Sequence, residues 1–291
     1  MFVARAAIAV GVALAGVVSC GAGVALGRIP TSPIASTSSP GTEAVAGSDS
    51  ASPAVSAPPR KKSKPPGELI DKNADPDTVI SRIENGVTVE SRLSTNNPVF
   101  FITIDDGWEQ QESAADYVTE TELPVTVFLT DAAVSENWAF FKKMGAFDAV
   151  QNHSMTHKAM SKASTNLDYE ICTTQKRYEE KYGVRPWILR PPYGAGFMPE
   201  NDSAQLIEKT AASCGIKHIA LWNVTVSKDG VIQFASEPYQ AGDIVLLHFE
   251  GDLKANLQKV VKQYAAKGLT PASLSKYLPE DGVAPVPGLP R

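Results

Sequence analysis

The chain has 291 residues, which is enough for one large folded domain with additional terminal segments. Its formal net charge is −5 and its sequence pI is about 5.5, so we expect no basic surface for nucleic acid. The one dense basic cluster, RKKSK at 60–64, lies in a segment without apolar periodicity and is expected to be solvated.

The N-terminal segment, residues 1–28, predicts export. Arg5 precedes an uncharged apolar stretch, 6–27, which is long enough to span a bilayer. Within it, VVSC at 17–20 resembles the processing site of a bacterial lipoprotein, in which Cys20 carries the lipid. A lipoprotein and an uncleaved transmembrane anchor are equally supported, and a soluble secreted form is the third alternative. All three place the folded part outside the cytoplasm, and the first two tether it to the bacterial cell membrane.

Two segments separate this stretch from the main domain. Residues 29–67 are rich in Pro, Ser, Thr, Ala and Gly, and such a composition predicts a disordered linker because it offers little apolar surface to bury. Residues 68–98 form an N-terminal extension in which Asn85-Gly86, between alternating segments, predicts a β-hairpin.

From 99 to 280 apolar segments alternate with helical ones, and 281–291 is a C-terminal tail. Strands are predicted at 99–104, 125–129, 149–152, 187–190, 218–224 and 244–248. Helices are predicted near 110–121, 135–144, 167–182, 202–214 and 253–266. This alternation predicts an α/β fold with a parallel sheet, either open or closed into a (β/α) barrel.

The cysteine count agrees with export. If Cys20 is lipidated or embedded in a membrane, Cys172 and Cys214 remain as an even pair. An oxidising compartment allows them to form a disulfide, and the alternative is two unpaired thiols on helix faces.

Three of the four histidines, together with two aspartates and an arginine, fall at the carboxyl ends of predicted strands. In (β/α) barrels this end of the strands carries the active site. The residues concerned are Asp105, Asp106, His153, His157, Arg190 and His248.

The spacing of two of these histidines suggests a metal site. His153 and His157 can direct both rings to one point if the segment forms a helical turn. Together with a carboxylate they supply three protein ligands and leave one position open, as in a catalytic zinc site. Taken alone, Asp105 and Asp106 before Gly107 also fit a solvated turn.

Four motifs together resemble those of the polysaccharide deacetylase family, the NodB-homology domain of carbohydrate esterase family four. They are TIDDG (103–107), HSMTH (153–157), RPPYG (190–194) and LLH (246–248), in the family's order. The resemblance covers roughly 95–270. It implies a distorted (β/α) barrel and metal-dependent hydrolysis of N-acetyl groups on amino-sugar polymers.

The resemblance also implies roles for individual residues. Asp106, His153 and His157 bind a divalent metal, which we expect to be Zn²⁺. Asp105 is the general base, and Arg190 pairs with it and keeps it ionised.

The same resemblance assigns the groups around the substrate. The backbone N–H of Tyr193 stabilises the oxyanion, and His248 is the general acid that protonates the departing amine. Leu246 forms the apolar wall around the acetyl methyl group.

The sequence departs from the family pattern at two positions. Trp108 replaces a proline after Asp-Asp-Gly and either stacks on a sugar ring or packs in the core. Thr225 stands where the fourth motif has an aspartate beside the catalytic histidine. Either Asp229 or Glu250 substitutes for that group, or His248 works without a carboxylate partner.

We therefore predict a tethered, extracytoplasmic, metal-dependent polysaccharide deacetylase that acts on an acetylated amino-sugar polymer, with cell-wall peptidoglycan favoured. We expect a monomer that does not bind nucleic acid. The alternative is a catalytically weak, deacetylase-like module that binds envelope carbohydrate, although an intact Asp105 argues against it.

Overall fold

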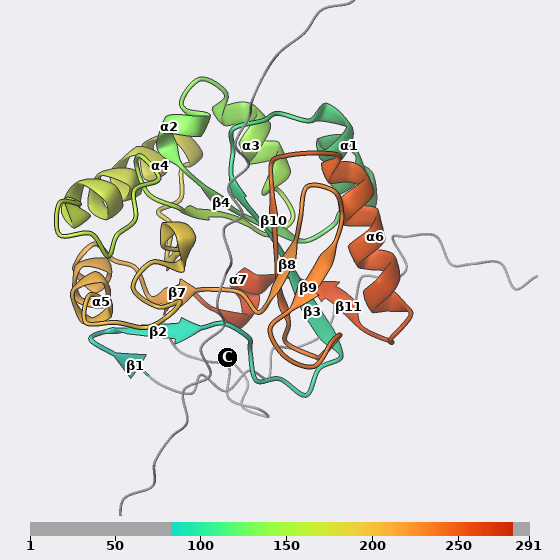
Figure 1. Ribbon diagram of the computed structural model, residues 1–291. Helices are drawn as coiled ribbons and strands as arrows, with labels where there is room; N and C mark the ends of the chain where they lie inside the picture. The colour runs from blue at the N-terminus through green and yellow to red at the C-terminus, as the bar shows by residue number, and fades with distance from the viewer. Residues whose placement is uncertain (1–82, 282–291) are drawn as a thin grey trace, which may run out of the picture. The chain divides into compact units, whose positions relative to one another are not determined.

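A computed structural model describes residues 83–281 (Figure 1). The predicted signal or anchor segment, the linker and nearly all of the C-terminal tail lie outside these residues. Within 83–281 no helix has both the length and the apolar character needed to cross a membrane.

The described chain begins with a hairpin. Asn85 and Gly86 both have positive φ, 48° and 90°, and join β1 (Ile83–Glu84) to β2 (Val87–Glu90) as antiparallel strands. Positive φ at both central residues is what a tight two-residue hairpin turn needs, and Asn-Gly adopts it at little cost. β2 then pairs in parallel with a strand far along the chain, so the hairpin is part of the main sheet.

One sheet of eleven strands forms the centre of the domain. Its order is β1-β2-β7-β6-β5-β4-β3-β10-β8-β9, and β11 pairs with β3. Only the β1–β2 and β8–β9 pairs are antiparallel. The remaining strands are β3 (Val99–Asp106), β4 (Val125–Leu129), β5 (Ala149–Asn152), β6 (Ile188–Leu189), β7 (His218–Ala220), β8 (Val224–Val226), β9 (Ile232–Phe234), β10 (Ile244–His248) and β11 (Thr270–Ala272).

Helices occupy most of the connections between parallel strands (Figure 1). The α-helices are α1 (Glu112–Thr121), α2 (Asp131–Val134), α3 (Trp138–Met144), α4 (Thr174–Tyr182), α5 (Ala204–Ser213), α6 (Leu253–Ala265) and α7 (Leu274–Tyr277). A π-helix, η2 (Asp168–Thr173), runs directly into α4, and a short 3₁₀ segment, η3 (Pro192–Gly194), follows β6.

Alternation along β3 shows how the sheet curls. Ile102 and Ile104 pack in the layer that contains α1, α3 and α6. Phe101 points to the opposite face, because successive strand residues alternate, and there it shares one buried cluster with Phe128, Ile188, Ala220 and Ile244. Five different strands therefore enclose a common interior. This confirms the predicted α/β fold and its distorted (β/α) barrel.

Two predicted elements differ from the structure. The single strand predicted at 218–224 is two strands, β7 and β8, because the chain leaves its partner β6 and moves to β10 on the other side of the barrel. Asn223 makes this crossing: its amide group bonds the Asp243 carboxylate and the Ile244 N–H. The helix predicted at 135–144 corresponds to α3, which begins three residues later, and the short helix α2 before it had no prediction. The short strands β9 and β11 had no prediction.

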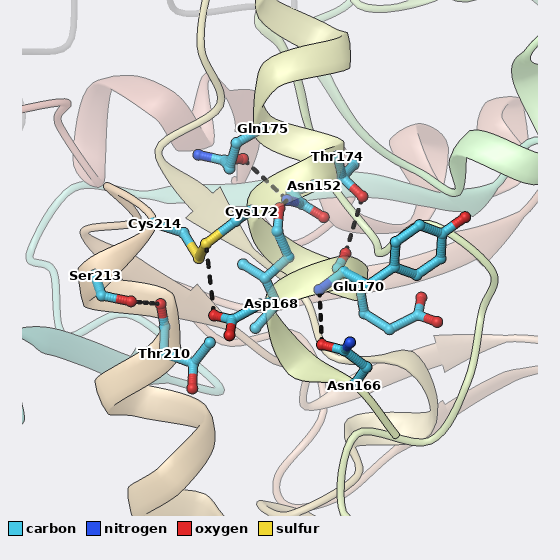
Figure 2. Close-up of a disulfide and its surroundings, with 12 residues drawn as sticks. Asn152, Asn166, Asp168, Glu170, Cys172, Thr174, Gln175, Thr210, Ser213 and Cys214 are labelled. Carbon is cyan, nitrogen blue, oxygen red and sulfur yellow. Dashed lines mark hydrogen bonds between the residues drawn. A yellow bond between two sulfur atoms is a disulfide. The ribbon is translucent and has the colours of Figure 1, made fainter. Parts of the chain in front are cut away.

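Cys172 and Cys214 form a disulfide, which ties η2 to the end of α5 (Figure 2). Their Cα atoms lie 4.9 Å apart across a sequence separation of 42. In the chain-entropy model, closing a loop of this length stabilises the folded state by about 4 kcal/mol. The bridge joins two elements that otherwise meet through side chains on the outside of the barrel.

Candidate active site

The two aspartates at the end of β3 point in different directions. Asp105 follows the inward pattern of Phe101 and Thr103 and is only 2 % exposed. Asp106 has φ 81°, a left-handed conformation that is rare outside glycine and turns the chain out of the strand. The adjacent carboxylates therefore enter different environments, and the structure rules out the alternative of a simple solvated turn.

Arg190, at the end of β6, is the partner of Asp105. Its guanidinium is fully buried and donates to the Asp105 carboxylate at 2.7 Å and to the Thr103 hydroxyl at 2.8 Å. It also donates to the backbone carbonyls of Ala220 and Leu221, both at 2.9 Å. Burial lowers the pKa of Arg190, and the charge of Asp105 opposes that effect. All three guanidinium nitrogens thus donate hydrogen bonds, and this fixes the orientation of Asp105.

Asp106, His153 and His157 converge on one point. An oxygen of Asp106 lies 2.9 Å from Nε2 of His157 and 3.3 Å from Nε2 of His153. The ligand atoms of the three residues all lie within 4.8 Å of one another. A tetrahedral zinc site separates its ligand atoms by about 3.3–3.6 Å, so the spacing suits a divalent cation.

The hydrogen bond on the far side of the His153 ring also supports a cation site. Nδ1 of His153 lies 2.7 Å from the backbone carbonyl of Arg190. A carbonyl can only accept, so Nδ1 carries a proton. In the neutral ring, which is the form that binds a metal, the lone pair is then on Nε2, the atom that faces Asp106. The Asp106 oxygen is itself buried without a hydrogen-bond donor in the described chain. A cation accepts electron pairs from all three atoms, and this donor set therefore fits one.

Electrostatics agree with a carboxylate that stays ionised. Burial acts to raise the pKa of Asp106, but the imidazoles of His153 and His157 beside it outweigh that effect, so its pKa lies well below the ordinary value. For His153 burial acts to lower the pKa of the ring, and the carboxylates of Asp105 and Asp106 raise it overall.

The two histidines do not converge through a helical turn, and that part of the prediction is wrong. The segment after β5 is an irregular loop in which Ser154 and His157 have positive φ, 80° and 58°. The Ser154 hydroxyl accepts the backbone N–H of His157 at 2.9 Å, and the ring centroids of His153 and His157 are 5.0 Å apart. Backbone bends, rather than helical periodicity, bring the rings together.

His248 lies beside Asp105. The register of β10 on β3 places the two residues opposite each other at the strand ends, and His248 is half-buried. Among residues 83–281 no carboxylate is within ion-pair distance of the His248 ring. Asp229 is exposed and Glu250 contacts His248 only through its backbone N–H, so neither substitutes for the aspartate that Thr225 replaces. Thr225 on β8 pairs with Leu246 on β10. Leu246 is two residues before His248, so both point to the same face of the strand.

The other predicted substrate contacts occupy distinct positions. Tyr193 has φ 63° and is 65 % exposed, and its hydroxyl lies 3.0 Å from Nδ1 of His157. Trp108 is 58 % exposed, which excludes the alternative that it packs in the core. Leu246 is buried on the inner face of β10, two residues before His248.

Three supporting residues were missed by the sequence reasoning. Thr103 bonds Arg190, Glu170 bonds the loop between the histidines, and Asn152 accepts the Ser154 N–H. Thr103 carried a usable signal, because a polar residue in an apolar strand, two before Asp105, must share its face. Glu170 and Asn152 gave none, since their partners depend on loop geometry.

Comparison with known proteins agrees with the family resemblance seen in the sequence motifs. Residues 92–218 match the family model "Polysaccharide deacetylase". An uncharacterised protein of Streptomyces coelicolor is 29 % identical over 221 residues, which is 73 % of this chain and 86 % of that protein. A protein of Bacillus cereus named peptidoglycan-N-acetylglucosamine deacetylase is 25 % identical over 199 residues, 65 % of this chain and 84 % of its own length.

Solved structures show the fold independently. A pseudoenzyme of carbohydrate esterase family four from Bacillus anthracis aligns with a TM-score of 0.53 at 21 % identity, covering 66 % of this chain and 69 % of that one. Its name shows that the fold also occurs without activity, so the fold alone does not establish a reaction. By the match to the family model, residues 92–218 of the chain form a polysaccharide deacetylase domain, the NodB-homology domain.

Proposed function

We propose that this protein is a metal-dependent hydrolase that removes N-acetyl groups from an amino-sugar polysaccharide. The observation that carries the proposal is the register of Asp105 with His248 beside the cluster of Asp106, His153 and His157. Acyl transfer needs a base on one side of the carbonyl and an acid near the leaving amine. Two adjacent strand ends supply both groups next to a site that fits a cation.

The chain's own residues divide the reaction between them. A divalent cation, when bound, supplies Lewis acidity at the acetamide. Asp105 accepts the proton of the attacking water, and Arg190 holds that carboxylate in place. The backbone N–H of Tyr193 donates to the developing oxyanion. His248 then gives a proton to the nitrogen as the bond to the acetyl carbon breaks, which releases acetate and a free amine.

Peptidoglycan is the substrate that we favour. A relative that is 25 % identical carries that specificity in its name. The predicted membrane tether also suits a polymer outside the cell. Chitin-like oligomers, exopolysaccharides and acetyl esters are the competing substrates.

Acetate release from a small panel tests the proposal. Purified full-length protein is incubated with N-acetylated peptidoglycan, chitin oligomers and acetylated xylan, with and without a chelator. We expect acetate from peptidoglycan, loss of activity with chelator and recovery when Zn²⁺ is added. A metal-loaded protein that releases acetate from none of these contradicts the proposal.

One observation favours a second function, a carbohydrate-binding module with weak turnover. No carboxylate among residues 83–281 supports the His248 ring, so its role as an acid lacks the partner implied by the family. Glycan binding without acetate release by the metal-loaded protein identifies this alternative.

Trp108 provides a prediction about substrate binding. Its exposed indole lies two residues after Asp106, and an aromatic face can stack on a sugar ring. Trp108→Ala is expected to raise KM for oligomers about tenfold, equivalent to about 1.4 kcal/mol, with little change in kcat. Val231→Ala, at an apolar side chain of similar exposure (53 %), serves as the control and should leave KM unchanged. Equal KM values for wild type and Trp108→Ala contradict the contact.

We place the domain outside the cytoplasm, tethered through the N-terminal segment. The support is the apolar stretch 6–27 and the VVSC sequence that ends at Cys20. Labelling cells with a palmitate analogue distinguishes the two tethers: a lipoprotein incorporates label that Cys20→Ser abolishes, whereas a transmembrane anchor stays in the membrane unlabelled. Recovery of the wild-type protein in the cytosol contradicts both.

A further inference from the structure

A buried glutamate holds the loop that carries the two histidines. Glu170 is 1 % exposed and lies on the π-helix η2. One carboxylate oxygen accepts the backbone N–H of Thr156 at 2.8 Å, and the other accepts the Thr156 hydroxyl at 2.5 Å. Thr156 immediately precedes His157. The glutamate therefore acts one residue away from a predicted metal ligand without being part of the ligand cluster itself.

The backbone of Glu170 contributes to the same contact. Its carbonyl accepts the N–H of Met155, the neighbour of Thr156, at 3.1 Å. Two consecutive loop residues are thus bound to one residue of η2. These bonds hold the part of the loop between Ser154 and His157, where both flanking residues have positive φ. Such conformations cost about 1–3 kcal/mol each and persist only where surrounding contacts impose them.

Two contacts with other elements and one local hydrogen bond hold the π-helix. Its Cys172 is bonded to Cys214 of the α5 end, and the Ile171 carbonyl accepts the side-chain amide of Asn152 at 3.2 Å. Thr174, at the start of α4, donates its hydroxyl to the Glu170 carbonyl at 2.9 Å. Figure 2 shows the Glu170 side chain on the same short helix as the disulfide but directed away from it. π-Helices are rare, and they occur frequently at functional sites.

We infer that Glu170 is a positioning residue for the metal site: by holding Thr156 from a covalently anchored π-helix, it sets the place of His157 relative to Asp106. The inference rests on the proposed metal-dependent function. It goes beyond it, because Glu170 lies outside the four motifs and contacts neither the ligand atoms nor the reacting groups. Residues that orient ligands in this way typically change metal affinity by about 10–100-fold when they are removed.

Metal affinity of the full-length protein tests the inference, measured as Zn²⁺ competition with a chromophoric chelator at fixed pH. Glu170→Ala is expected to weaken Zn²⁺ binding at least tenfold. Glu170→Gln should keep affinity within about threefold of wild type, because its amide oxygen still accepts the Thr156 N–H and its amide nitrogen can donate to the hydroxyl. Thr156→Val, which removes one of the two side-chain bonds at constant shape, should have an intermediate effect.

A matched control separates positioning from general stability. Asp148 similarly accepts backbone N–H groups, those of Leu274 and Ser275, but at α7 on the other side of the barrel. Asp148→Ala should lower stability and leave Zn²⁺ affinity unchanged. Wild-type Zn²⁺ affinity in both Glu170→Ala and Thr156→Val overturns the inference. If Glu170→Ala does not fold, wild-type affinity in Thr156→Val overturns it, and so does a loss of affinity in Asp148→Ala equal to that in Thr156→Val. Absence of Zn²⁺ binding in the wild type instead overturns the proposed function.

Discussion

Replacing Asp106 by alanine is expected to remove bound metal and deacetylase activity together. The Asp106 carboxylate is the one acidic member of the three-residue cluster, and its oxygen lies within 3.3 Å of both imidazole nitrogens. Without it two neutral rings remain, which are too few ligands for a stable zinc site. Elemental analysis after dialysis should show less than about a tenth of the wild-type metal content, with activity at background.

Its neighbour supplies a matched control. Asp105→Asn keeps the size of the side chain and its hydrogen bond to Arg190 but removes the base. We expect full metal occupancy and a loss of activity of about 10²–10⁴-fold. Metal content therefore distinguishes the roles of the two adjacent carboxylates. Full metal content in Asp106→Ala, or metal loss in Asp105→Asn with activity retained, contradicts the division of roles.

The second large effect is expected at Arg190. Its guanidinium is fully buried and makes four hydrogen bonds, two to side chains and two to backbone carbonyls. Arg190→Met fills much of the space but leaves Asp105 buried without its counter-charge. Breaking a buried pair from one side lowers the free energy of unfolding by about 3–5 kcal/mol, and we expect a loss in that range from denaturant titration.

A double-variant cycle identifies the cause of this loss. In Arg190→Met/Asp105→Asn the unpaired charge is absent, so the loss should be smaller than the sum of the two single losses by at least 1 kcal/mol or so. Arg190→Lys keeps a charge but lacks the planar fork, and it should fall between wild type and Arg190→Met. Strict additivity in the cycle would show that Arg190 acts through packing against Phe128 and not through Asp105.

The sequence alone was sufficient for the fold class and for the positions of most site residues. Apolar runs such as 99–104 and 244–248 have the composition of buried parallel strands, and polar residues directly after such runs must share one edge of the sheet. This local rule predicted that Asp105, Arg190 and His248 lie together. The Asn85-Gly86 hairpin was also predictable, because the preference for a tight turn depends on these two residues alone.

Only the tertiary structure decided how the site is held. The convergence of His153 and His157 depends on two loop residues with positive φ. The spacing of apolar residues in the sequence does not predict such backbone conformations. The position of Glu170 depends on a π-helical turn that sequence patterns do not distinguish from the α-helix that follows it. The crossing from β7 to β8 likewise depends on Asn223 bonding a strand remote in sequence. Sequence patterns predict the conformation and burial of each residue from its neighbours in the chain. The features named above arise from contacts between segments that are distant in sequence, and these contacts form only in the folded structure.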